Sequence, residues 1–191
     1  TARDIDTVRL PGYENANELV FVNGTFAPEL STIRSSEKEL IVLPLEEAAN
    51  GRYKELVNEH LGKSSLVVKD GLHALNTSFI YGGVFIYVNE NKIVERPIYL
   101  YHLADARDNH TLAQPRSLIY VETSAKVQMA ESFATIGSMD SFTNGVAEIV
   151  VNDNAIVEYY KIQNDGTNAS QVGTTHMSQI GKCYVQTVTV S

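Results

Sequence analysis

The chain has 191 residues, of which 43% are hydrophobic and 20% are charged, and its formal net charge is −8. These values are typical of a folded, soluble protein, and the acidic balance without a basic stripe argues against nucleic acid as a partner. Apolar runs are too short to span a bilayer, so no membrane partner is expected. The single cysteine, Cys183, cannot form an internal disulfide, which favours a reducing, cytoplasmic location.

Residues 1–82 are predicted to form a small mixed α/β segment. A β-hairpin is expected over residues 19–26, because Asn23-Gly24 at its centre favours the positive φ angles of a type I′ turn. Residues 41–45 are predicted to form another short strand.

Two helices are expected next. Apolar side chains recur at helical spacing over residues 46–61, and Gly62 follows as a left-handed cap. Gly51 is a weak point within this amphipathic helix. Asp70 is expected to cap a shorter helix that ends before the glycine pair at residues 82–83.

The chain from residue 83 onward contains a repeat. Residues 119–127 match residues 149–157 position by position at an interval of 30, and a weaker copy occupies residues 86–94. Each copy reads as a strand, a three-residue polar turn and a second strand. Strict alternation within a copy predicts one buried face. In the copy at residues 119–127 the expected core side chains are Ile119, Val121, Ala125 and Val127.

Stacked rungs account for this repeat, since each copy can bury its apolar edge against its neighbours. An antiparallel β-sandwich is the alternative, but it would not require matching at a fixed interval. The expected fold is mostly β, with an incomplete right-handed parallel β-helix (solenoid) over residues 83–191 after the mixed segment at residues 1–82. Residues 188–190 have the apolar-x-apolar form of residues 149–151 and are interpreted as a fourth copy. The chain is therefore expected to stop within a rung, and Ser191 is not expected to be the natural terminus.

Several short segments share a resemblance to one known family. They are Leu-Val-Phe-Val-Asn-Gly at 19–24, Leu-Asn-Thr-Ser-Phe at 75–79, Gly-Val-Phe-Ile-Tyr-Val at 83–88, Glu-Arg-Pro-Ile at 95–98, Pro-Arg-Ser-Leu-Ile at 115–119, Glu-Ile-Val-Val at 148–151 and Val-Glu-Tyr-Tyr-Lys-Ile-Gln at 157–163. In this order they resemble the SufB/SufD family of iron-sulfur cluster assembly scaffolds. The first segment resembles the SufD branch in particular.

The resemblance implies a non-catalytic scaffold subunit with a β-helix core. In that family a SufD-type subunit pairs with a SufB-type subunit, and the SufC-type ATPase serves the pair. Members are more than twice as long as this chain, and the family's cysteine, histidine and SufC-docking region belong to parts beyond Ser191 or to the partner. No catalytic, cofactor-binding or metal-ligating residue is therefore carried onto this chain, and an iron-sulfur cluster is expected only with the partner. A homodimer is left open.

Gly62-Lys63-Ser64 has the form of the end of a phosphate-binding loop. That loop requires a glycine five positions before Gly62, where Val57 stands, and it should follow a strand rather than a helix. Any ATP chemistry is therefore assigned to a partner.

The segment from His102 to His110 contains two histidines and the carboxylates of Asp105 and Asp108. These side chains would suffice for a metal if the segment folded back on itself. A polar loop between rungs is the preferred interpretation, because irregular spacing does not ensure ligand geometry.

Other polar residues are given ordinary roles. Cys183 is interpreted as a small core residue rather than an iron or sulfur ligand. The outward column of Tyr87, Tyr120 and Val150 is either a partner-facing patch or a surface covered by the N-terminal segment. Acid-base pairs are conceivable among the glutamates, although solvated turns explain them equally well. These glutamates are Glu122, Glu131, Glu148 and Glu158, and the remaining histidines without an assigned role are His60, His73 and His176.

Three functions compete at this point. The leading hypothesis is the scaffold subunit of iron-sulfur cluster assembly. A polysaccharide lyase or hydrolase is the alternative, because β-helices often carry carboxylate chemistry, although the chain has no tryptophan to stack on sugars. A structural solenoid without chemistry is the third.

Overall fold

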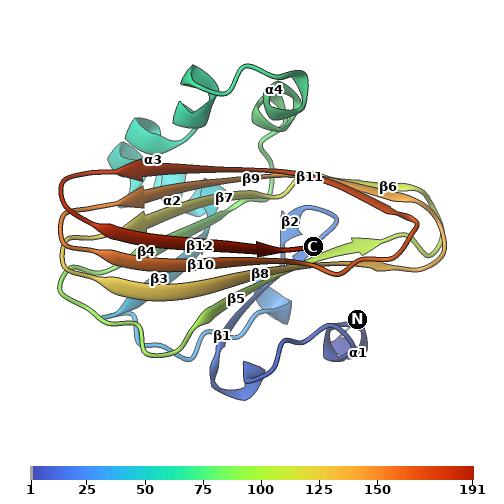
Figure 1. Ribbon diagram of the computed structural model, residues 1–191, viewed down its shortest axis with the longest axis horizontal. Helices are drawn as coiled ribbons and strands as arrows, with labels where there is room; N and C mark the ends of the chain where they lie inside the picture. The colour runs from blue at the N-terminus through green and yellow to red at the C-terminus, as the bar shows by residue number, and fades with distance from the viewer. Residues whose placement is uncertain (1) are drawn as a thin grey trace.

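The structure is a computed structural model that describes residues 2–191, with side chains from residue 4 onward. Two β-sheets face each other and form a parallel β-solenoid of about four turns (Figure 1). In order along the sheet, sheet A consists of β12 (Tyr184–Val190), β10 (Ile156–Gln163), β8 (Lys126–Ile136), β5 (Ile98–Asp105), β1 (Asn17–Val22) and β2 (Thr25–Phe26). Sheet B consists of β11 (Ala169–Gln179), β9 (Ser141–Val151), β7 (Arg116–Val121), β4 (Val84–Val88) and β3 (Leu40–Pro44), and β6 (Thr111–Ala113) pairs with β9.

The rungs are stacked in the register that the repeat predicts. Ile119 of β7 is aligned with Ile149 of β9, and Val127 of β8 with Val157 of β10. Strands one turn apart are parallel, whereas the pairs β1–β2 and β3–β4 are antiparallel. The mostly-β solenoid is thus confirmed. Because β1 and β3 join the same two sheets, strands on both sides of residue 83 share one core, and the division at that residue stays a prediction.

The turns between the strands stack as well. Asn91, Ser124 and Asn154 occupy matching places in three rungs and have positive φ angles of 58°, 57° and 57°. Each donates its backbone N–H to a carbonyl of the next turn, at 2.6 to 3.0 Å. In the next turn Gly181, with a φ of 77°, lies one place earlier, beside Asp153, and Lys182 takes the matching place. Asparagine adopts the left-handed conformation more readily than most residues, which fits Asn91 and Asn154.

The position predicted for the fourth copy was wrong. Residues 188–190 lie in sheet A beside Tyr160–Ile162, not on Ile149–Val151 of sheet B. The residue aligned with Ile149 is Met177, 28 positions later. The sequence Met-Ser-Gln at 177–179 lacks the apolar-x-apolar form of the first strand in earlier copies. The alternation in β12 was therefore mistaken for that first strand.

The hairpin and the short helix agree with the sequence analysis, but the long helix is divided. Helices α2 (Leu45–Asn50) and α3 (Lys54–His60) are separated at Gly51, whose backbone is extended. A Cβ atom there would lie 2.9 Å from the Glu47 carbonyl oxygen, so the chain bends where only glycine fits. Asp70 caps α4 (Gly71–Ser78) by accepting from the His73 backbone N–H. The remaining elements are α1 (Ala2–Asp6) and the 3-10 helices η1 (Tyr13–Asn15), η2 (Pro28–Leu30) and η3 (Lys63–Leu66).

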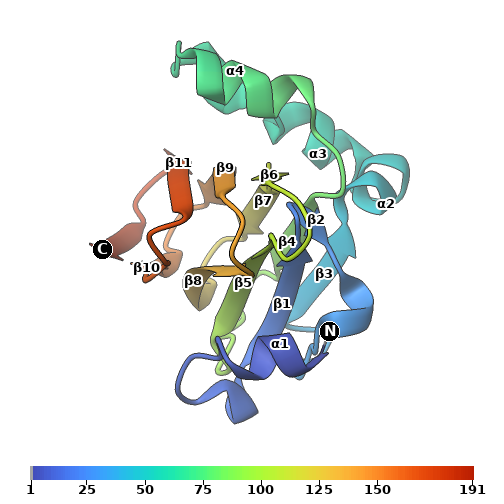
Figure 2. The same ribbon diagram turned by 90° about the vertical axis from the view of Figure 1, so that its right-hand side faces the viewer.

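Helices lie on the outer faces of both sheets, with α2, α3 and α4 along sheet B and α1 beside sheet A (Figure 2). On sheet B, Tyr53 and Val57 pack on Phe85 and Leu118, and the half-buried rings of Tyr87 and Tyr120 adjoin this cluster. On sheet A, Ile5 of α1 packs with Val20, Tyr101 and Leu103. The tyrosine column is therefore covered by the N-terminal segment, which was one of the two alternatives. Within the described chain no helix has the length and apolar character needed to cross a bilayer.

The interior register generates a direct test. Val121→Asp and Val151→Asp should each prevent folding or cost several kcal/mol, because each would place a carboxylate at a fully buried position among aliphatic side chains. Lys126→Asp, at an exposed position of β8, should cost less than about 1 kcal/mol. Urea denaturation followed by circular dichroism measures all three, and equal effects of inward and outward changes would contradict the register.

Candidate functional site

A cluster of charged side chains lies inside the solenoid on sheet A. His102 of β5, Glu131 of β8 and Lys161 of β10 come from three neighbouring strands, and each is at least nine-tenths buried. Alternation along the strands places Glu131 and Lys161 on the same face as the core residues Val127 and Val157. The lumen of the solenoid therefore holds a carboxylate between two nitrogen bases.

The contacts of Glu131 are long for a buried charge cluster. His102 Nε2 lies 3.3 Å from Oε1 of Glu131, and Lys161 Nζ lies 3.6 Å from Oε2. Charge-assisted hydrogen bonds are usually about 2.7–2.9 Å long. Burial by itself raises the pKa of Glu131, but the hydrogen bond with His102 and the electrostatic effect of His102 and Lys161 outweigh it and lower the pKa to about 2. Glu131 is therefore ionised at neutral pH.

Tyr159 lies one inward position before Lys161 on β10. Its side chain is only 3% exposed, and its hydroxyl has no hydrogen-bond partner of ordinary geometry. Burial, followed by the negative charge of nearby Glu131 and the contact of the hydroxyl with its carboxylate, raises the pKa of Tyr159 well above its usual value. The lumen thus contains a protonated phenol beside the charged cluster.

A second buried ion pair lies on the opposite, outer face of sheet B. The Glu148 carboxylate of β9 accepts from Arg116 Nη2 of β7 at 2.6 Å, from the Gly62 backbone N–H at 2.8 Å and from the Ser64 N–H at 2.7 Å. Burial raises the pKa of Glu148, but the charge of Arg116 and the amide hydrogen bonds outweigh it and lower the pKa below its usual value. We call these four residues the outer clamp.

The outer clamp extends into α4. Arg116 Nη1 donates to Asn76 Oδ1 at 3.1 Å, and Asn76 Nδ2 donates to the carbonyl oxygens of Asn144 at 2.7 Å and Pro115 at 3.2 Å. His73 Nε2 lies 2.9 Å from the Ser64 hydroxyl oxygen. These contacts fasten residues 62–78 to sheet B. The network is structural, because its contacts join this segment to β7 and β9, although Arg116 Nε within it has no hydrogen-bond partner.

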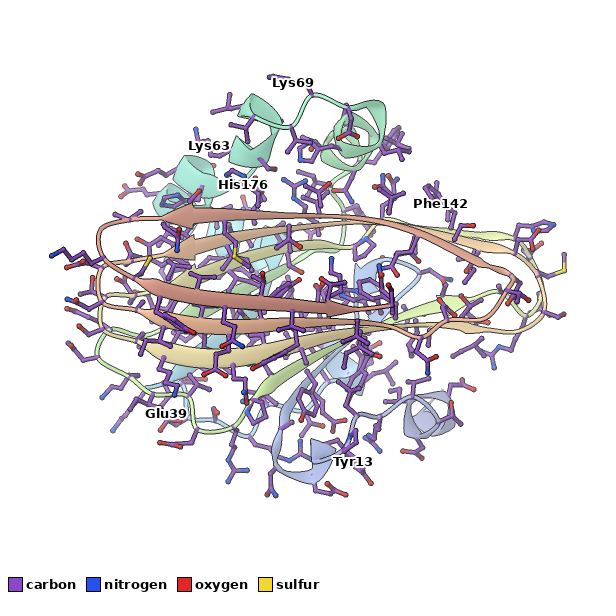
Figure 3. All side chains as sticks on the ribbon, viewed as in Figure 1. Tyr13, Glu39, Lys63, Lys69, Phe142 and His176 are labelled. Carbon is purple, nitrogen blue, oxygen red and sulfur yellow. The ribbon has the colours of Figure 1, made fainter. Side chains whose placement is uncertain are left out.

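The outer clamp also settles the role of the Gly62-Lys63-Ser64 triplet. Its backbone amides at Gly62 and Ser64 bind the carboxylate of Glu148, so an internal anion stands where a phosphate would have to bind. Lys63 lies on the helical cover, away from the two sheets (Figure 3). The resemblance to a phosphate-binding loop was correctly set aside.

The structure separates the candidate metal ligands of residues 102–110. His102 faces the lumen, Asp105 forms a surface ion pair with a neighbouring arginine, and exposed His110 lies 3.5 Å from Asp140 Oδ2. Over residues 2–191 no group of three or more histidine, cysteine, aspartate and glutamate side chains is placed to hold a metal ion. The expectation that this chain alone binds neither metal nor cofactor stays a prediction.

The other candidates fall into place individually. Cys183 is half-buried against the core, at the position that Ala155 occupies one rung earlier, as expected for a small core residue. The interpretation as solvated turn residues was wrong for Glu131 and Glu148, because both lie on strands and are buried.

The remaining candidate side chains contact neighbours: Tyr87 Oη donates to Glu122, Gln128 Nε2 donates to Glu158, His60 packs on Tyr120, and His176 Nε2 lies 3.3 Å from Ser178 Oγ.

Sequence reasoning missed the lumen cluster although a signal was present. The same alternation that places Val127 and Val157 inside also places Glu131 and Lys161 inside, four residues later in each rung. Extending the match between the two copies by four residues would have placed the Glu131 carboxylate beside the Lys161 ammonium group. Arg116 gave no such signal, because its partners lie in distant parts of the chain.

The lumen cluster predicts an acid-dependent contribution to stability. The folded pKa of Glu131 is about 2 against an ordinary value of 4.5, so its stabilisation is present above about pH 4.5 and is lost as the pH falls toward 2. Glu131→Gln should cost about 3 to 5 kcal/mol at pH 7, because Lys161 loses its buried counter-charge. Urea titrations at pH 7, 4.5 and 3 measure both effects, with Glu158→Gln on the outer face as control. A deficit that does not shrink at low pH would contradict this account.

The outer clamp predicts local release of the helical cover. Glu148→Gln should cost about 3 to 5 kcal/mol, because Arg116 is left buried without a counter-charge. Amides of residues 62–78 should then exchange faster than those of β7 and β9 in hydrogen-exchange mass spectrometry. Glu90→Gln, at an exposed turn, is the matched control. Unchanged exchange in the cover of the Glu148 variant would show that the clamp does not hold it.

Comparisons with known families cover nearly the whole chain in two consecutive parts. Residues 12–100 match the family model described as "SufBD protein N-terminal region", and residues 102–191 match "SUF system FeS cluster assembly, SufBD core domain". The first match contains α2 to α4, and the second contains every strand of the solenoid from β6 onward.

Individual relatives agree with these matches. The chain is 29% identical over 174 residues to an iron-sulfur cluster assembly SufBD family protein of Synechocystis, covering 85% of this chain and 37% of the relative. It is 26% identical over 171 residues to the iron-sulfur cluster assembly protein SufD of Bacillus subtilis, covering 88% and 38%. A SufBD family protein of Pyrococcus horikoshii is 34% identical over 131 residues, covering 68% and 28%. The chain thus spans less than two fifths of these relatives, and the consecutive matches show that it belongs to the SufB/SufD family.

Proposed function

We propose that this chain acts in iron-sulfur cluster assembly as part of a non-catalytic scaffold subunit of the SufD type. The observation that carries the proposal is the match of both family regions in consecutive order along one solenoid. A relative of similar sequence bears the name iron-sulfur cluster assembly protein SufD. The cluster in this account is cargo that is built with a partner.

The proposed partners are a SufB-type subunit and a SufC-type ATPase. Support for a separate ATPase comes from the Gly62-Lys63-Ser64 triplet, whose amides are occupied by Glu148. Support for a second scaffold subunit comes from membership of the SufB/SufD family, which implies the Suf system in general.

Co-purification tests the partnership. The tagged chain, co-expressed with the SufB-type and SufC-type subunits of the same organism, should recover the SufB-type subunit, with the ATPase joining through it. The purified chain alone should hydrolyse no ATP and release no reducing ends from acidic polysaccharides. Tyr184→Ser, which removes an exposed aromatic side chain of β12, is the control for non-specific hydrophobic adsorption.

A second readout is the activity of iron-sulfur enzymes in cells. Loss of the gene should lower the activity of a cluster-dependent dehydratase, and the wild-type gene should restore it. Recovery of neither partner, together with normal cluster enzymes after gene loss, would overturn the scaffold proposal. Turnover of a polysaccharide would favour the lyase alternative instead.

A further inference from the structure

Three asparagines of the sequence are followed directly by glycine, and this pair of residues is chemically labile. They are Asn23, Asn50 and Asn144. The backbone nitrogen of the glycine can attack the side-chain carbonyl carbon of the asparagine, because no Cβ atom crowds its approach. Asparagine is accordingly counted among the thermolabile residues of proteins. The attack requires the backbone and the amide to rotate, and the fold constrains the three pairs to different degrees.

Two of these pairs are held rigidly. Asn144 lies in β9 and is 2% exposed, and its Nδ2 donates to a carbonyl oxygen of α4 at 2.8 Å. Asn23 lies in the tight turn between β1 and β2, where its Oδ1 accepts from the Asp105 backbone N–H at 2.7 Å. A Cβ atom at Gly24 would lie 2.5 Å from the Gln114 backbone nitrogen, so this turn is closely packed. Neither amide can reach its glycine nitrogen without local unfolding.

The third pair, Asn50-Gly51, is exposed at the bend between α2 and α3. Both residues are exposed, and the Gly51 backbone is extended, with φ of −101° and ψ of −151°. Asn50 Nδ2 donates to the Glu46 carbonyl oxygen at 2.8 Å, but this hydrogen bond is itself exposed and lies in the last turn of a helix of six residues. Short helices are marginally stable and their ends fray, which releases the Asn50 amide.

From these differences we propose that Asn50 is a site of spontaneous deamidation in the folded protein, whereas Asn23 and Asn144 are protected. The Gly51 backbone nitrogen gives its proton to solvent and forms a bond to the side-chain carbon of Asn50, and the bond from that carbon to the amide nitrogen breaks. The amide nitrogen takes a proton from water and leaves as ammonia, and a cyclic imide remains. A water molecule then opens the ring at either carbonyl, which yields aspartate or its β-linked isomer.

The product differs from the original protein in charge and in backbone. Its new carboxylate lies three and four residues after Glu47 and Glu46, at the end of α2 where the helix dipole disfavours negative charge. The β-linked isomer has an additional atom in the backbone between α2 and α3. The bend at Gly51 is therefore a place where the covalent structure of the helical cover changes with time. This inference is separate from the scaffold function and does not depend on it.

Incubation of the folded protein at mildly alkaline pH, followed by peptide mapping with mass spectrometry, tests the site. Conversion of amide to carboxylate should be at least tenfold faster at Asn50 than at Asn23 or Asn144, with both aspartate and its β-linked isomer present. Asn50→Gln should remove the acidic form that the wild type develops on anion exchange, because glutamine would have to close a larger ring. Asn58→Gln, at an exposed position of α3 followed by glutamate, is the matched control and should develop that form as the wild type does.

The same incubation in urea shows whether the fold sets the order of rates. All three pairs should convert at similar rates in the unfolded chain, and circular dichroism verifies that each variant is folded without urea. Equal rates in the folded protein, or faster conversion at Asn23 or Asn144, would overturn the proposal. A folded wild type that keeps the Asn50 amide while the unfolded chain loses it would overturn it as well, because α2 would then protect its own end.

Discussion

Parallel hydrogen bonding between strands one turn apart is the constraint on which the other features of this protein depend. It aligns Ile119 with Ile149 and Val127 with Val157, so that each rung buries the same face as its neighbour. A slip of one residue would turn every inward side chain outward. The aliphatic core, the left-handed turn residues and the position of Glu131 next to Lys161 all follow from this single register.

The two sheets use buried charge in opposite ways. On the outer face of sheet B, Glu148 has three short contacts of 2.6 to 2.8 Å, and the result is a rigid attachment for the helical cover. Inside sheet A, the contacts of Glu131 are 3.3 and 3.6 Å long, and an adjacent pocket remains. In both networks a carboxylate lies opposite a buried cation, so removal of either partner would leave an unpaired buried charge.

Much of the fold follows from local rules, and the exceptions have physical causes. The 30-residue interval and strict alternation predicted the rungs and their core, since both are direct consequences of stacked strands. The fourth rung was misplaced because Gln179 stands where earlier rungs have Val88, Val121 and Val151. The lumen cluster was overlooked because charged residues on strands are ordinarily solvated. Glu148 could not be matched to Gly62 and Ser64 from sequence, since 84 to 86 residues separate these partners.

Disulfide trapping across one turn tests the register most directly. Gln128 and Glu158 are aligned on the outer faces of β8 and β10, so cysteines at these two positions in a Cys183→Ala background should oxidise rapidly. Cysteines at Gln128 and Ile156, which lie diagonally on the same face, would be roughly 8 Å apart between Cα atoms, too far for a disulfide. The account predicts fast cross-linking of the aligned pair and little of the diagonal pair. Equal rates, or preference for the diagonal pair, would contradict the stacking on which the core and both charge networks depend.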